Sequence, residues 1–158
     1  PQDGYPDDGS VTQSELSVEA IRRLCAITGR LHAATVLDTD SHLDECQIEA
    51  MRLSSLVGLV VRPDMTGLSR ARWALSTLTD RGVSRDRFRL VLNRVGQAGQ
   101  IDPATIEHTL GIEVFQKIPE DSVSVNRAVN RGIPVTELFK SSRIGRSFSS
   151  FAQSVQTS

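Results

Sequence analysis

Short apolar runs alternate with amphipathic stretches along the chain. Apolar residues recur at helical spacing between positions 16 and 27, after a capping-box pattern at Thr12 and Glu15, and Gly29 is expected to end this helix. Residues 33–37 (AATVL) follow as a short apolar run, which is typical of a strand buried on both faces. The pattern therefore predicts a helix followed by a strand.

The same alternation continues to the C-terminus. Short apolar runs predict further strands at residues 56–61, 88–92 and 112–118. Helices are expected at residues 43–53 and 67–81, from the Asp102–Pro103 cap to Gly111, in the stretch that ends at Gly132, and around the apolar residues of 144–155. Alternating strands and helices imply right-handed crossovers. We therefore expect an α/β fold with a parallel sheet of about four strands flanked by helices, in a Rossmann-like three-layer sandwich.

One domain accounts for nearly the whole chain. Its 158 residues suffice for an ordinary hydrophobic core. The first ten residues, PQDGYPDDGS, are polar, and we assign residues 1–11 to a linker and residues 12–158 to the domain. Because the chain opens with Pro1 and not with methionine, we expect another segment to precede it in a longer parent protein.

Composition and charge disfavour several classes of function. The chain has 18 basic and 19 acidic residues, so it carries no large field to attract nucleic acid or anionic lipid. Its two cysteines, Cys25 and Cys46, lie far apart and indicate reduced thiols in a cytoplasmic protein, without the clustered ligands of a metal site. No run of 18 apolar residues and no signal peptide is present in the sequence.

Polar residues follow each expected strand directly. They are Asp38 after the first strand, Arg62–Pro63–Asp64 after the second, Asn93–Arg94 after the third and Pro119–Glu120–Asp121 after the fourth. Parallel sheets place their chemistry at the carboxyl ends of their strands. The sequence therefore predicts a ligand-facing edge built from these four sets of residues.

Four stretches in this order carry a resemblance to a known family. They are TVLDTD (35–40), GLVVRPDMTGLSRAR (58–72), RLVLNRVG (89–96) and KIPEDSVSVNRAVNRGIPVTEL (117–138). Together they resemble the deviant-Walker ATPases of the MinD/ParA group, and within it the CpaE/TadZ branch with its septum-site-determining relatives. The resemblance implies the C-terminal part of a P-loop NTPase fold, with ATP and Mg²⁺ as cofactors of the complete protein. It also implies a role in positioning septum, pilus or other envelope machinery.

The resemblance assigns Asp38 to the Walker-B-like position, where a carboxylate holds a magnesium-bound water. The alternative is that Asp38 only ends a strand or caps the next helix. The family usually continues with T-P-P-G, whereas this chain reads Asp38-Thr39-Asp40-Ser41-His42. Asp40 could strengthen metal binding as a second catalytic-site carboxylate, or it could repel the nucleotide phosphates.

The other strand ends resemble the nucleobase side of the family's site. An amide donates and accepts at once, which suits the edge of adenine, and the resemblance gives this role to Asn93 of the Asn93–Arg94 pair. A turn-forming asparagine is the alternative. Pro119, Glu120 and Asp121 resemble the loop that packs over the base, although the two acids also suit the start of the next helix.

The family's phosphate-binding loop is absent from the 158 residues, because no glycine-rich turn is followed by a lysine. We therefore expect the isolated chain not to hydrolyse ATP unless the parent supplies the loop. Three interpretations stay open: a fragment of a larger MinD/ParA-like ATPase, a degenerate scaffold for localisation or dimerisation, and an unrelated doubly wound α/β enzyme. No nucleophile–base pair or dinucleotide fingerprint favours the last.

Expected partners follow from the resemblance and the charge pattern. The resemblance implies a homodimer, protein partners in an envelope or secretion machinery, and recruitment to a pole or septum. The basic residues around 70–89 are interrupted by Asp80 and Asp86 and lack interleaved aromatic residues, which disfavours DNA binding. The polar side of the last helix is rich in serine, so direct membrane insertion is not expected.

Overall fold

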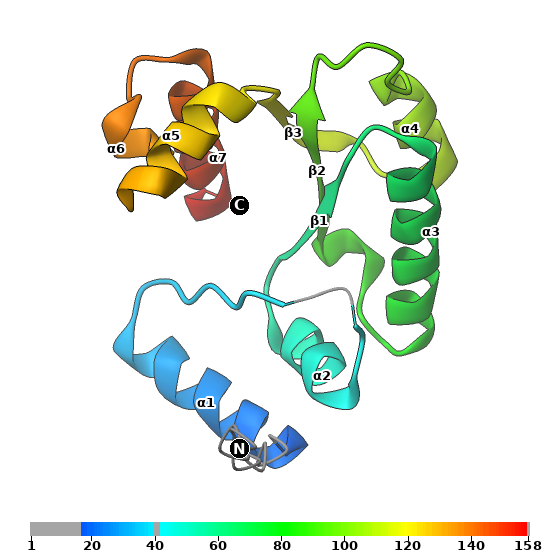
Figure 1. Cartoon of the computed structure of the whole chain (residues 1–158). Coiled ribbons are helices and arrows are strands. Elements are labelled where there is room, and N and C mark those ends of the chain that lie inside the picture. The colour runs from blue at the N-terminus through cyan, green and yellow to red at the C-terminus, as the bar shows by residue number, and fades with distance from the viewer. Residues whose placement is uncertain (1–16, 40–41, 158) are drawn as a thin grey trace, which may run out of the picture. The chain divides into compact units, whose positions relative to one another are not determined.

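The computed structural model describes residues 17–39 and 42–157. The chain divides into two compact units, the first ending at Leu53 and the second beginning at Ser54. The first unit contains helices α1 (Val18–Leu31) and α2 (Glu45–Leu53). The second contains a sheet and the remaining helices (Figure 1). The capping box at Thr12 and Glu15 and the residues Asp40 and Ser41 lie outside the described residues.

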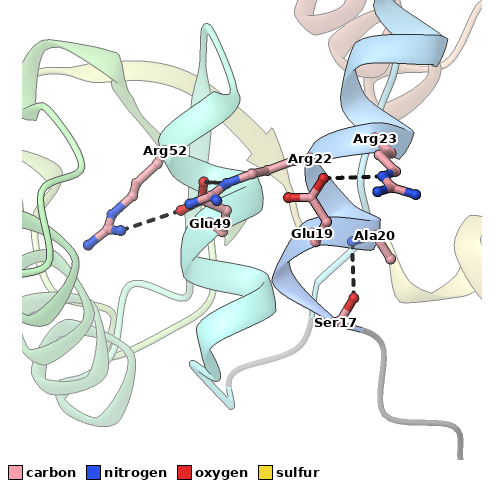
Figure 2. Close-up of polar contacts among 7 residues, drawn as sticks. All are labelled: Ser17, Glu19, Ala20, Arg22, Arg23, Glu49 and Arg52. Atoms are coloured by element: carbon pink, nitrogen blue, oxygen red, sulfur yellow. Dashed lines mark hydrogen bonds and ion pairs between the residues drawn. The ribbon is translucent and has the colours of Figure 1, made fainter.

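A buried carboxylate joins the two helices of the first unit (Figure 2). Glu49 of α2 is only 7% exposed, and its Oε1 accepts a hydrogen bond from Arg22 Nε of α1 at 2.7 Å. Its Oε2 accepts a second from Arg52 at 3.4 Å. A buried charge is tolerated when it is paired. The ion pair therefore lies in the same unit as the buried apolar side chains of Ile21 and Ile48 without leaving Glu49 unpaired.

The sheet of the second unit has three parallel strands in the order β1 (Val57–Val61), β2 (Phe88–Val95) and β3 (Val114–Pro119). Leu59 pairs with Leu90 and Val61 with Leu92, so β1 and β2 run in register. This confirms the α/β class and the parallel sheet flanked by helices.

Helices cover both faces of this sheet. Figure 1 shows α3 (Met65–Asp80) and α4 (Pro103–Leu110) on one side, and α5 (Ser122–Arg131), α6 (Val135–Leu138) and α7 (Arg143–Gln156) on the other. The apolar stripe of α3 is buried as its spacing predicts, whereas Trp73 of the same helix is 56% exposed. On the other face Val91, Ile118 and Ile144 form one buried cluster.

Two expectations for the first unit are wrong. Residues 33–37 are not a strand: Val36 is 90% exposed, and the described residues provide the segment with no strand partner. An apolar run becomes a buried strand only where a neighbour takes its backbone hydrogen bonds, so the sheet has three strands and not four. Gly29 does not end α1, which continues to Leu31, because one glycine costs a helix only about 1 kcal/mol.

The expectations for the second unit are mostly confirmed. Asp102 caps α4, Pro103 is its first residue, and Gly111 ends it in the left-handed conformation. The strand predicted for residues 88–92 is longer, because β2 includes Asn93 and Arg94 and ends at Val95. The short helices η1 (Arg85–Arg87) and α6 have no counterpart in the sequence pattern.

Candidate functional site

The carboxyl ends of the three strands lie at one edge of the sheet, which we call the rim. β1 leads into Arg62, β2 ends at Val95, and β3 ends at Pro119, which pairs with Val95. Because the strands are parallel, three of the four predicted polar strand ends come together in the second unit. Asp38, the fourth, belongs to the first unit.

The turn from β1 to α3 forms one part of the rim. Asp64 caps α3 through a hydrogen bond from Gly67 N to its Oδ1 at 2.7 Å, and its Oδ2 lies 3.2 Å from Arg62 Nε. A side chain at Gly67 would meet the Arg62 carbonyl oxygen at 2.3 Å. The first turn of α3 therefore lies tightly against the end of β1.

A β-bulge shapes the end of β2. Leu92 pairs with Lys117 and Val95 with Pro119, so three steps along β2 match two along β3. The extra residue falls at Asn93–Arg94, where Arg94 has a φ of 61°. A non-glycine residue rarely adopts a left-handed backbone, and bulges of this kind re-aim side chains next to functional sites.

Asn93 is half-buried at this bulge. Within residues 17–39 and 42–157 its side-chain amide has no hydrogen-bond partner. A half-buried amide at a strand end, with its donors and acceptor uncommitted, can bind a ligand that offers both kinds of group. The structure thus leaves the predicted base-reading side chain available.

Glu120 is engaged with protein groups from three segments. Its side chain is 22% exposed; Oε1 accepts from Ser122 N at 3.0 Å, and Oε2 accepts from Gln97 Nε2 at 3.2 Å and lies 3.9 Å from Arg94 Nε. Gln97 was not anticipated from the sequence. Its only sequence signal is weak, because Gln97 is simply a polar residue two positions after the strand. The pairing of β2 with β3 brings it near Glu120.

The remaining predicted contacts also have structural roles. Pro119 is buried as the last residue of β3, and Glu120 N donates to Val95 O at 2.9 Å. Asp121 caps α5 by accepting from Ser124 N at 3.0 Å, and this hydrogen bond holds the pKa of the Asp121 carboxyl below its usual value. The capping of α5 agrees with the helix-start alternative for the two acids, while binding of a base by Pro119, Glu120 and Asp121 stays a prediction.

Asp38 lines a hollow of about 540 Å³ in the first unit. Asp44 also lines the hollow, and its Oδ1 accepts a hydrogen bond from Gln47 N at 2.8 Å. The other lining residues are Ile21, Leu37, Thr39, Cys46, Gln47 and Ala50. Across the described ranges, no three His, Cys, Asp or Glu side chains are grouped to hold a metal ion. A magnesium ion bound through water needs few protein oxygens, so the roles of Asp38 and Asp40 stay predictions.

In the described part of the chain, no helix has the length and apolar character needed to cross a bilayer. The expected partners stay predictions.

Comparison with solved structures shows which fold this is. The chain is similar to a ParA family ATPase from Chlorobium tepidum TLS, with a TM-score of 0.80 and 19% identity over 87% of this chain and 57% of that one. It is also similar to the septum site-determining protein MinD from Pyrococcus horikoshii OT3, complexed with Mg-ADP, with a TM-score of 0.70 and 19% identity over 84% and 54% of the two chains.

A third similar structure is the cell division ATPase MinD of Pyrococcus furiosus, with a TM-score of 0.62 and 23% identity over 73% of this chain and 48% of that one. No protein-family model and no curated protein matches the chain. The likeness shows that the chain has the fold of the ParA and MinD ATPases, and that it spans about half the length of these structures.

Proposed function

We propose that the chain is the C-terminal portion of a MinD/ParA-like ATPase of the CpaE/TadZ type, which positions septum, pilus or other envelope machinery. The uncommitted amide of Asn93 at the bulged rim carries this proposal, because it occurs in the ParA and MinD fold at the place where the resemblance puts the base-reading residue. ATP and Mg²⁺ would be the ligands of the complete protein, as the Mg-ADP complex of the P. horikoshii relative illustrates.

In this proposal each predicted site residue has its own role. Within the second unit, Asn93 would read the adenine edge, and Pro119 and its neighbours would shape the space beside the base. Asp38 of the first unit is a separate prediction, and its carboxylate would hold a magnesium-bound water. The phosphates would be bound by a glycine-rich loop of the complete protein. The complete protein would act as a cytoplasmic homodimer that is recruited to a pole or septum by protein partners.

The test is base selectivity in a protein that carries both this chain and a phosphate-binding loop. Asn93→Ala should lower the preference for ATP over GTP about tenfold or more, because a site that pairs with a polar edge discriminates through those hydrogen bonds. Isothermal titration with both nucleotides measures the ratio. Unchanged selectivity in Asn93→Ala would remove the base-reading role.

One sequence feature favours a second candidate, a non-hydrolysing scaffold of the same fold. The chain has Asp40-Ser41-His42 where the family has a glycine-containing turn, and Asp40 adds negative charge where phosphates would lie. If the loop-bearing protein binds neither nucleotide in the same titration, the scaffold interpretation replaces the ATPase.

A further inference from the structure

The Glu120 carboxylate is bonded to the protein through both of its oxygens. Its two oxygens take hydrogen bonds from Ser122 N at 3.0 Å and Gln97 Nε2 at 3.2 Å, and Arg94 Nε lies 3.9 Å from the second oxygen. Each oxygen therefore accepts one hydrogen bond from the protein, and Arg94 adds an ion pair at a distance too long for a hydrogen bond. Its mostly buried side chain is therefore better suited to hold protein segments together than to contact a nucleotide.

The three groups come from different parts of the rim. Arg94 lies in the bulge of β2, Gln97 lies in the loop that follows, and Ser122 begins α5. The same loop is further fixed where Gly96 N donates to Gln100 Oε1 at 2.7 Å. We call the Arg94–Gln97–Glu120 set the rim clamp.

Among the described residues, Arg94 of the clamp is the one non-glycine residue with a left-handed backbone. The Arg94 conformation, with φ 61°, costs about 1–3 kcal/mol and persists only where surrounding contacts enforce it. Asn93 precedes Arg94 directly, and its amide makes no hydrogen bond within the described residues. The backbone of the bulge sets the direction in which the Asn93 side chain leaves the strand. The clamp contacts this bulge through Arg94 and the loop that follows it through Gln97.

We propose that Gln97 and Glu120 are positioning residues, which set the base selectivity of Asn93 by fixing the bulge and do not contact the base themselves. This inference rests on the base-reading role of Asn93 in the proposed function. It predicts that residues with no contact to the ligand change the discrimination between adenine and guanine.

The experiment measures AMP and GMP binding by NMR titration to the same loop-bearing protein that tests the proposed function. Gln97→Leu should lower the AMP-over-GMP ratio about fivefold, because it removes a hydrogen bond to a carboxylate and leaves that carboxylate underpaired. Glu120→Gln should also lower the ratio, because it removes the charge that pairs with Arg94 and replaces a charged acceptor with a neutral one. Gln153→Leu and Glu113→Gln make the same chemical changes at exposed sites and should leave the ratio unchanged.

The reciprocal exchange Gln97→Glu with Glu120→Gln gives the sharpest readout. It rebuilds the amide–carboxylate contact in the opposite direction, so selectivity should return to within about twofold of the wild type. A purely structural loss at each position would make the double variant worse than either single one. Circular dichroism confirms that each variant is folded.

The outcomes separate the two claims. If Asn93→Ala abolishes selectivity while Gln97→Leu and Glu120→Gln leave it intact, the clamp is wrong and the proposed function stands. If the wild type binds AMP and GMP equally, or if Asn93→Ala changes nothing, the base-reading role fails and the positioning role fails with it. A double variant without rescue also overturns the clamp.

Discussion

At the scale of single residues, Gly67 shows how closely the rim is built. Its backbone passes the end of β1 so tightly that an added Cβ would lie 2.3 Å from the Arg62 carbonyl oxygen. Backbone atoms cannot rotate away as a side-chain tip can. The first turn of α3 would therefore have to shift, together with the Asp64 cap that binds Gly67 N.

We expect Gly67→Ala to destabilise the protein by about 1–3 kcal/mol, as overpacking does elsewhere. Urea unfolding followed by circular dichroism measures the change. Gly58→Ala in β1 is the matched control, because a Cβ there meets nothing within 4 Å. Equal stability of the two variants would show that the close approach at Arg62 is not constraining.

The sequence could name the rim residues but not the state of their side chains. The sequence indicates a ligand or a turn for Asn93, and a ligand or a helix start for Glu120 and Asp121, without deciding between these roles. The structure separates them, since Asn93 is uncommitted, Glu120 joins three segments and Asp121 caps a helix. The contacts of Glu120 depend on the pairing of β2 with β3, which has no local sequence signal.

At the scale of secondary-structure elements, the ion pair between α1 and α2 makes the first unit sensitive to acid. The Arg22 hydrogen bond holds the pKa of the Glu49 carboxyl below its ordinary value. A lowered pKa in the folded state means that the unfolded chain binds the proton more readily. The contribution of the pair is therefore complete above the ordinary carboxyl pKa and is lost as the pH falls through the lowered one.

We expect the contact between α1 and α2 to loosen as the pH falls below about 4, which amide hydrogen exchange in α1 can measure. Glu49→Gln should exchange faster at neutral pH and show a weaker acid dependence. Glu19→Gln is the control, because Glu19 is 59% exposed in its pair with Arg23 and exposed pairs contribute little. An acid response that is the same in Glu49→Gln would assign it to another group.

Elements whose signals are local were predictable, and those that need a neighbour were not. Asp102, Pro103 and Gly111 define α4 by their own backbone preferences, and the structure has that helix where they place it. The run at residues 33–37 is as apolar as a true strand, yet its state depends on whether another strand lies beside it. The sequence pattern shows that this run is apolar, but it does not show whether another strand lies beside it.

At the scale of the whole molecule, the sequence predicts that the isolated chain does not hydrolyse ATP. The fold is that of the ParA and MinD ATPases, but the chain spans about half of their length and contains no glycine-rich loop followed by lysine. Without backbone N–H groups around the phosphates, the charge that develops during phosphoryl transfer is not stabilised.

We therefore expect no magnesium-dependent ATP hydrolysis by the isolated chain above the buffer blank, measured by phosphate release. The Asp38→Ala variant should give the same blank value. Turnover that co-purifies with the chain and disappears in Asp38→Ala would contradict the prediction, and would place a complete catalytic site within these 158 residues.

The position of Trp73 on α3 has a consequence for measurements of unfolding. It is the only tryptophan of the chain, so intrinsic emission excited at the indole band originates in the second unit alone. The first unit is optically silent in such a measurement. A melting curve recorded by emission and one recorded by helical ellipticity would therefore diverge if α1 and α2 melt separately, and the gap between the curves would report the smaller unit without any label.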